Sequence, residues 1–144
     1  MTGPPPRALR LAHRGDWRAA PENTLGAMRA ALVNPACDGL EFDVRGSREG
    51  IPILLHDATL DRVQRRPGRP EALSIDELAE AGIPALAAVL AAAGPGPFLD
   101  VELKGEPVPE VIPVLVVARG TALARAVVST FEADTIAWIG DRRP

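Results

Sequence analysis

The run that decides the fold reads Gly39-Leu40-Glu41-Phe42-Asp43-Val44. Short apolar runs bounded by turn residues are typical of β-strands. Side chains two apart on a strand point to the same side, so Glu41 and Asp43 should present two carboxylates to one face. Working outward from this run, four others have strand character, at residues 9–13, 51–56, 98–103 and 126–130.

Longer helical patterns separate these runs. In the clearest, residues 74–81, Ser74 can cap the helix, Glu77 completes a capping box and Gly82 supplies a stop. Further helices are expected at residues 24–33 (capped by Asn23 or Thr24), 86–93, 109–119 and from 133 to 143. Strands and helices in alternation predict an α/β fold with a parallel sheet. Residues 51–55 are almost continuously apolar, as expected of a buried parallel strand.

The composition is that of a globular protein. The 144 residues suit one domain, 1–144, with a sizeable core, and 47% of them are apolar. A net charge of −3 argues against nucleic-acid binding, and the lone Cys37 requires no oxidising compartment. No apolar stretch reaches the roughly 18 residues of a membrane span. Residues 1–10 also lack the apolar core of a signal peptide, so we expect a cytoplasmic protein.

A third carboxylate follows in the motif Glu102-Leu103-Lys104, at the end of the run at 98–103. Carboxylates at the ends of successive parallel strands converge on one mouth of the sheet. Glu41, Asp43 and Glu102 therefore predict a site of hard oxygen ligands for one divalent cation, Mg²⁺ or Ca²⁺. Zinc fits less well, because the chain has no cysteine cluster and two histidines only.

The two histidines each follow an apolar run. His13 and His56 therefore form a candidate acid–base pair, since imidazole titrates near neutral pH. Arg14 and Lys104, the only lysine of the chain, are candidates for holding a phosphate, one through its fork and one as a compact charge. A base, an acid and a cation are what metal-assisted cleavage of a phosphodiester needs.

Other polar residues near these motifs are open to two interpretations. Asp57 could orient an imidazole or cap a turn, and the turn is favoured. Glu22 and Asn23 should shape the first loop over the site, where the helix that follows would aim N–H groups at an anion. A solvated loop is favoured over phosphate attraction for four arginines, Arg62, Arg65, Arg66 and Arg69.

The motifs together resemble the glycerophosphodiester phosphodiesterase family. They appear in the family's order as His-Arg-Gly from 13, Pro-Glu-Asn-Thr from 21, Glu-x-Asp from 41, His-Asp from 56, Thr-Leu-Asp-Arg from 59 and Glu-x-Lys from 102. The resemblance implies a TIM-barrel (β/α)₈ fold with its site at the C-terminal ends of the strands. It assigns Glu41, Asp43 and Glu102 to the metal, His13 and His56 to proton transfer, and Arg14 and Lys104 to the phosphate. The implied reaction converts a glycerophosphodiester to glycerol 3-phosphate and an alcohol.

The chain is shorter than such a barrel, which takes roughly 250 residues. It is therefore expected to be an incomplete domain, truncated after about five strands. The exposed edges of an open sheet would invite pairing with another chain, so self-association is one expectation. Two alternatives to the activity remain open: an inactive barrel fragment or remnant that binds phosphate or metal, and a sphingomyelinase-type phospholipase D.

Overall fold

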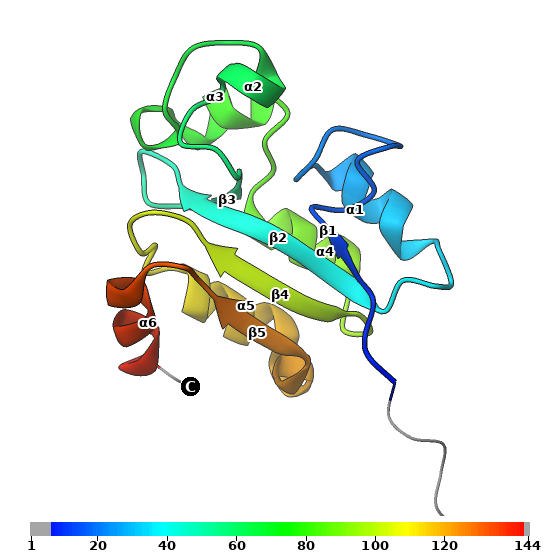
Figure 1. Cartoon of the computed structure of the whole chain (residues 1–144). Helices are drawn as coiled ribbons and strands as arrows, with labels where there is room; N and C mark the ends of the chain where they lie inside the picture. The colour runs from blue at the N-terminus through cyan, green and yellow to red at the C-terminus, as the bar shows by residue number, and fades with distance from the viewer. Residues whose placement is uncertain (1–6, 143–144) are drawn as a thin grey trace, which may run out of the picture.

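The computed structural model describes residues 7–142, which form one sheet backed by helices (Figure 1). The strands are β1 (Leu11–His13), β2 (Gly39–Gly46), β3 (Pro52–Leu54), β4 (Phe98–Leu103) and β5 (Ala126–Ser129). The α-helices are α1 (Leu25–Leu32), α2 (Asp61–Gln64), α3 (Ile75–Glu80), α4 (Leu86–Ala93), α5 (Val111–Arg119) and α6 (Ala133–Gly140). Two 3₁₀ turns, η1 (Pro70–Ala72) and η2 (Gly120–Arg125), complete the set.

The sheet is parallel along the order β1-β2-β4-β5, as the alternating pattern predicts. Strand β4 and helix α4 have the predicted bounds, and the other parallel strands differ by one or two residues. Ser74 and Glu77 make both hydrogen bonds of the capping box, and Thr24 caps α1 by accepting from the N–H of Ala27. The helix expected up to residue 143 ends at Gly140, and residue 143 lies outside the described range.

The prediction of a parallel strand at residues 51–56 is wrong. The strand there is β3, which pairs antiparallel with the end of β2, placing Arg45 opposite Ile53. The three residues of β3 are buried, which explains why this run is apolar. They are buried in a hairpin that returns along β2, and not in a parallel strand. Pro52 lies opposite Gly46 at the far end of this ladder, where a missing N–H donor is tolerated. The sheet therefore has four parallel strands and one antiparallel extension.

Helices α1, α4 and α5 pack on one face of the sheet, and α4 and α5 lie behind it in Figure 1. Alternate residues of β2 and β4 point into this layer and are fully buried, among them Leu40, Phe42, Leu99 and Val101. A second, smaller cluster lies under α2 and α3 and is built from Ile53, Leu55, Leu60, Leu78 and Ile83. The residues between the buried ones on β2 and β4 face the other side of the sheet, where the polar motifs lie.

Each outer strand of the sheet has one edge without a strand partner among residues 7–142. Self-association through these edges stays a prediction, as does the cytoplasmic location. Among the described residues, no helix combines the length and apolarity that a bilayer crossing needs.

Candidate active site

Three carboxylates meet on one face of the neighbouring strands β2 and β4. Asp43 and Glu102 are register partners on these neighbouring strands, and Glu41 lies two residues before Asp43 on the same face. Glu41, Asp43 and Glu102 each offer one oxygen within 4.8 Å of the others. Asp43 is fully buried, while Glu41 and Glu102 are mostly buried. The i, i+2 spacing of the sequence thus places the predicted ligand set together.

The electrostatics of this cluster favour a cation. Burial raises the pKa of Glu41 to about 7, and the negative charge of nearby Asp43 adds to the effect. The Oε1 atom of Glu41 is buried and has no hydrogen-bond partner among residues 7–142. A buried carboxylate beside two further carboxylates is costly, and either a proton or a bound cation relieves that cost. The residues present therefore fit a bound divalent metal ion of the oxygen-preferring kind.

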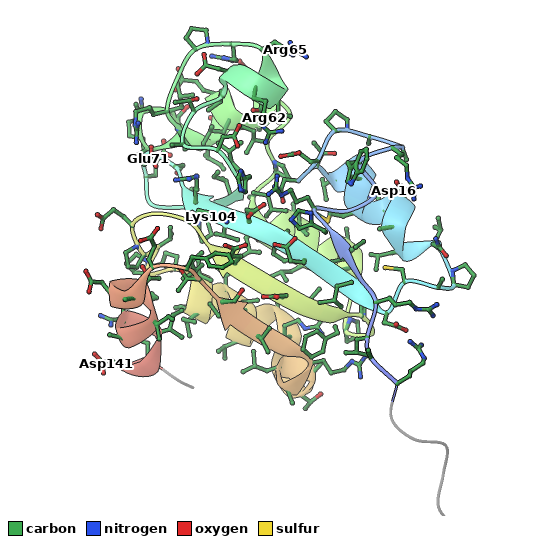
Figure 2. All side chains as sticks on the ribbon, in the orientation of Figure 1. Asp16, Arg62, Arg65, Glu71, Lys104 and Asp141 are labelled. Atoms are coloured by element: carbon green, nitrogen blue, oxygen red, sulfur yellow. The ribbon has the colours of Figure 1, made fainter. Side chains whose placement is uncertain are left out.

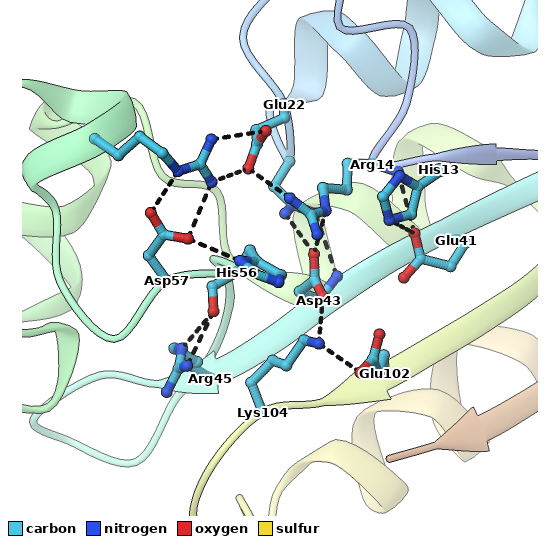
Figure 3. A network of polar contacts seen from close by, with 12 residues as sticks. His13, Arg14, Glu22, Glu41, Asp43, Arg45, His56, Asp57, Glu102 and Lys104 are labelled. Atoms are coloured by element: carbon cyan, nitrogen blue, oxygen red, sulfur yellow. Dashed lines mark hydrogen bonds and ion pairs between the residues drawn. The ribbon is translucent and has the colours of Figure 1, made fainter. Parts of the chain in front are cut away.

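Two cations contact the same carboxylates (Figure 3). The Nζ atom of Lys104 lies 2.5 Å from Oε1 of Glu102 and 3.4 Å from Oδ1 of Asp43. The Nε atom of Arg14 lies 3.1 Å from Oδ2 of Asp43. The structure thus brings the two predicted phosphate-binding residues to opposite sides of Asp43. Lys104 also lies beside the ring of Phe131, at 5.4 Å from its centroid.

The loop after β1 has a backbone shape that aims Arg14 at the site. Arg14 has a left-handed φ of 60°, and its N–H donates to the carbonyl of Glu41 at 2.8 Å. Gly15 follows with φ 79°, where an added Cβ would lie 2.6 Å from the backbone of Ala27 in α1. The His-Arg-Gly motif therefore needs glycine at its third position, because the loop approaches α1 too closely for a side chain.

The two histidines differ in how firmly they are held. His13, at the end of β1, is 66% exposed, and its Nε2 lies 3.7 Å from Oε2 of Glu41. His56 follows β3, and its Nδ1 lies 2.7 Å from Oδ1 of Asp57. The carbonyl of His56 accepts two hydrogen bonds from the Arg45 guanidinium, at 3.0 and 2.9 Å. Both backbone and ring of His56 are thus fixed.

The sequence pattern of the Glycerophosphoryl diester phosphodiesterase family matches residues 13–139, which is most of the chain. The chain belongs to this family. Glycerophosphodiester phosphodiesterase 1 of Bos taurus is 43% identical over 75 residues, which cover 52% of this chain and 22% of that protein. A glycerophosphodiester phosphodiesterase of Caldanaerobacter subterraneus is 36% identical over 72 residues, covering 50% and 29%.

Solved structures of the family share the fold. A glycerophosphodiester phosphodiesterase from Agrobacterium tumefaciens matches with a TM-score of 0.83 and 27% identity, covering 93% of this chain and 62% of that one. The enzyme from Thermotoga maritima matches with a TM-score of 0.77 and 26% identity, covering 88% and 55%. The fold is thus of the TIM-barrel type, and the chain spans little more than half of these solved relatives.

For several site residues, the structure shows contacts that the sequence-based interpretation did not predict. Arg62, expected in a solvated loop, makes ion pairs with Asp57 and Glu22. Asp57, expected to cap a turn, contacts the His56 ring. Arg45 was missed, although it lies two residues after Asp43 and the strand period therefore places it on the same face.

Asn23 also has a direct part in the site. Its Nδ2 donates to Oδ2 of Asp43 at 2.9 Å, so this loop residue contacts a predicted metal ligand. Glu22 next to it accepts from Arg14 at 3.1 Å. The expected shaping of the loop by these two residues is confirmed by these contacts.

Proposed function

We propose that this protein hydrolyses glycerophosphodiesters to glycerol 3-phosphate and an alcohol. One observation carries the proposal: three carboxylates, from Glu41, Asp43 and Glu102, lie within 4.8 Å of one another beside Arg14 and Lys104. The family membership supports it, as does a related structure. A phosphodiesterase from Oleispira antarctica, solved with its product sn-glycerol-3-phosphate, matches with a TM-score of 0.68 and 26% identity.

Glu41, Asp43 and Glu102 would hold one divalent cation, Mg²⁺ or Ca²⁺. Such an ion would neutralise the charge that develops on the phosphoryl oxygens during cleavage. The Oε1 atom of Glu41 supports this assignment, because it is buried and has no hydrogen-bond partner among the described residues, which leaves its lone pairs for a cation. The hydrogen bond from Nδ2 of Asn23 would orient the carboxylate of Asp43, as residues that contact metal ligands commonly do.

The histidines would carry the protons. One imidazole accepts the proton of the attacking hydroxyl or water, and the other protonates the departing alkoxide. The Nδ1 atom of His56 faces Asp57, which leaves its Nε2 for the substrate. The high exposure of His13 at the end of β1 lets substrate reach its ring.

Arg14 and Lys104 would bind the phosphate of the substrate. The Arg14 guanidinium offers a planar pair of donors, and the Lys104 ammonium offers a point charge on the other side of Asp43. Their contacts with carboxylates keep both cations at the site before substrate arrives. A diester monoanion between them would be held by charge-assisted hydrogen bonds.

A second candidate is a binding role for the same carboxylates and cations. On this alternative the chain binds metal or phosphate without turnover. A sphingomyelinase-type phospholipase D activity is the third candidate, because it needs a similar set of residue types.

One assay distinguishes the three candidate functions. The purified chain is incubated with glycerophosphocholine or sphingomyelin in Mg²⁺, in Ca²⁺ and in EDTA. Release of glycerol 3-phosphate that requires a divalent metal supports the proposal. Cleavage of sphingomyelin in preference to glycerophosphocholine supports the phospholipase D. A folded chain that binds metal and releases nothing supports the non-catalytic candidate.

A further inference from the structure

The Arg62 side chain joins two carboxylates that come from different loops, those of Asp57 and Glu22. Figure 3 shows these two carboxylates on the same side of the site. The Nε atom of Arg62 donates to Oδ2 of Asp57 at 2.7 Å, and its Nη2 donates to Oδ1 of Asp57 at 3.0 Å. On its other side, Nη2 donates to Oε1 of Glu22 at 2.6 Å and Nη1 to Oε2 at 3.1 Å. Glu22 precedes Arg62 by 40 residues. The guanidinium thus makes a two-pronged contact with each carboxylate.

The contact with Asp57 holds in place the oxygen that the His56 ring meets. Asp57 is ionised at neutral pH even at the ordinary pKa of an aspartate, so its carboxylate is an acceptor only. The two hydrogen bonds from Arg62 fix the orientation of both of its oxygens. The Oδ1 atom of Asp57 lies 2.7 Å from Nδ1 of His56, and that nitrogen must therefore donate. A neutral His56 then has its hydrogen on Nδ1 and a free lone pair on Nε2.

The contact with Glu22 leads to the other side of the site. Oε1 of Glu22 also accepts from Nη1 of Arg14 at 3.1 Å, and Arg14 lies against Asp43. A continuous path of charged contacts therefore runs from the imidazole of His56 to the predicted metal ligand Asp43. Arg62 is the one residue of this path that contacts both loops.

The two loops belong to separately packed parts of the molecule. Leu60, two residues before Arg62, is fully buried in the small cluster under α2 and α3. The loop of Glu22 leads into α1, which packs on the main core through Met28 and Ala31. In Figure 2, Arg62 points from α2 toward the sheet, whereas Arg65 points away from it.

We propose that Arg62 is a positioning residue: through Asp57 it holds His56 as the Nδ1–H tautomer, and through Glu22 it ties the Arg14 loop to the His56 loop. The catalytic consequence rests on the proposed function, whereas the tautomer does not. Isolated surface ion pairs contribute little, but a network with paired two-pronged contacts is the exception. Arginine is required, because a lysine ammonium cannot present a planar fork to two carboxylates.

The chain offers a matched control four residues away. Arg66 lies in the same segment, is exposed, and makes no hydrogen bond or ion pair with any residue between 7 and 142. Arg66→Gln removes the same charge as Arg62→Gln without touching the path. Arg62→Lys keeps the charge at the site and removes only the fork.

The test is two-bond ¹H–¹⁵N correlation spectroscopy of the histidine rings, which distinguishes the Nδ1–H from the Nε2–H tautomer. Only two histidines are present, so a His13→Gln variant assigns both sets of signals. We expect one dominant Nδ1–H tautomer for His56 in the wild type and in Arg66→Gln. In Arg62→Gln and Arg62→Lys we expect a mixture of tautomers, with the His13 signals unchanged.

An unchanged Nδ1–H signal of His56 in both Arg62 variants would overturn the proposal. If Arg62→Gln loses its folded backbone spectrum, Arg62→Lys decides the question alone. Turnover supplies the second readout, with kcat expected to fall about 10-fold in Arg62→Gln, as for other residues that orient catalytic groups. A wild-type chain without turnover would contradict the proposed function, and the spectra would still decide the role of Arg62.

Discussion

Asn23 holds Asp43 at two points, through side chain and backbone. Its Nδ2 donates to Oδ2 of Asp43 at 2.9 Å, and its Oδ1 accepts from the N–H of Asp43 at 3.2 Å. Both residues are buried, with Asn23 only 3% exposed. Asn23 also has a left-handed φ of 56°, a conformation that asparagine tolerates better than most residues. The loop after β1 and the strand β2 are thus joined at the predicted metal site.

Replacing Asn23 should therefore damage both stability and metal binding. Asn23→Ala leaves the N–H of Asp43 unpaired and should cost about 1–3 kcal/mol of unfolding free energy. The affinity for Mg²⁺ should fall roughly 10-fold or more, because Asp43 loses the group that orients it. Thermal unfolding and metal titration measure the two effects. Equal metal affinity in the variant and the wild type would contradict the orienting role.

A pair of glycines tests the close approach of the first loop to α1. Gly15 and Gly82 have similar φ values, 79° and 80°, but an added Cβ at Gly82 would meet nothing within 4 Å. Gly82→Ala should cost only the left-handed penalty, about 1 kcal/mol. Gly15→Ala adds a clash with the backbone of Ala27 and should cost about 3 kcal/mol. Equal losses in chemical denaturation would show that the loop relaxes freely.

The pH dependence of stability should report the contact between Asp57 and Arg62. Hydrogen bonds from Arg62 lower the pKa of Asp57 in the folded chain from 3.8 to about 2. The unfolded chain therefore binds the proton more tightly, so the contribution is complete above about pH 5 and lost as the pH falls toward 2. At neutral pH it should be about 1 kcal/mol at most, since Arg62 is half exposed.

Asp57→Asn is the variant for this measurement. The unfolding free energy of the wild type should exceed that of the variant above pH 5, and the difference should shrink steadily toward pH 2. A difference that stays constant over this range would mean that Asp57 does not titrate against Arg62.

The histidines are tested by turnover. His13→Ala or His56→Ala should each lower kcat by about 100-fold or more, if each imidazole moves a proton. Release of glycerol 3-phosphate from glycerophosphocholine measures the loss. A variant with nearly normal turnover would remove its histidine from the mechanism.

Local sequence rules predicted most of the fold. The run at 98–103 alternates carboxylates with buried Leu99, Val101 and Leu103, and β4 has these bounds. Residues 51–56 were interpreted wrongly, because an apolar run records burial but not strand direction. The direction of β3 is set by the tight return after β2, where the N–H of Gly50 donates to the carbonyl of Ser47.

In the site, too, local spacing could be predicted from the sequence and long-range contacts could not. Glu41 and Asp43 could be placed on one face from their spacing, and the convergence with Glu102 follows from parallel neighbouring strands. The path through Arg62 could not be predicted, because its partner Glu22 is 40 residues away and no period relates the two. Exposed arginines in a proline-containing loop look alike in sequence, and only tertiary packing separates Arg62 from its neighbours.

Calorimetric titration of the wild-type chain with Mg²⁺ and with Ca²⁺ tests the proposed metal site. The titration is done at pH 8, above the raised pKa of Glu41, where that carboxylate is ionised. We expect one ion bound per chain, with affinity at least about 10-fold weaker in Glu41→Gln, while the exposed Glu106→Gln binds as the wild type does. Absence of binding by the folded wild type, or equal affinity in Glu41→Gln, would contradict the metal site on which the account depends.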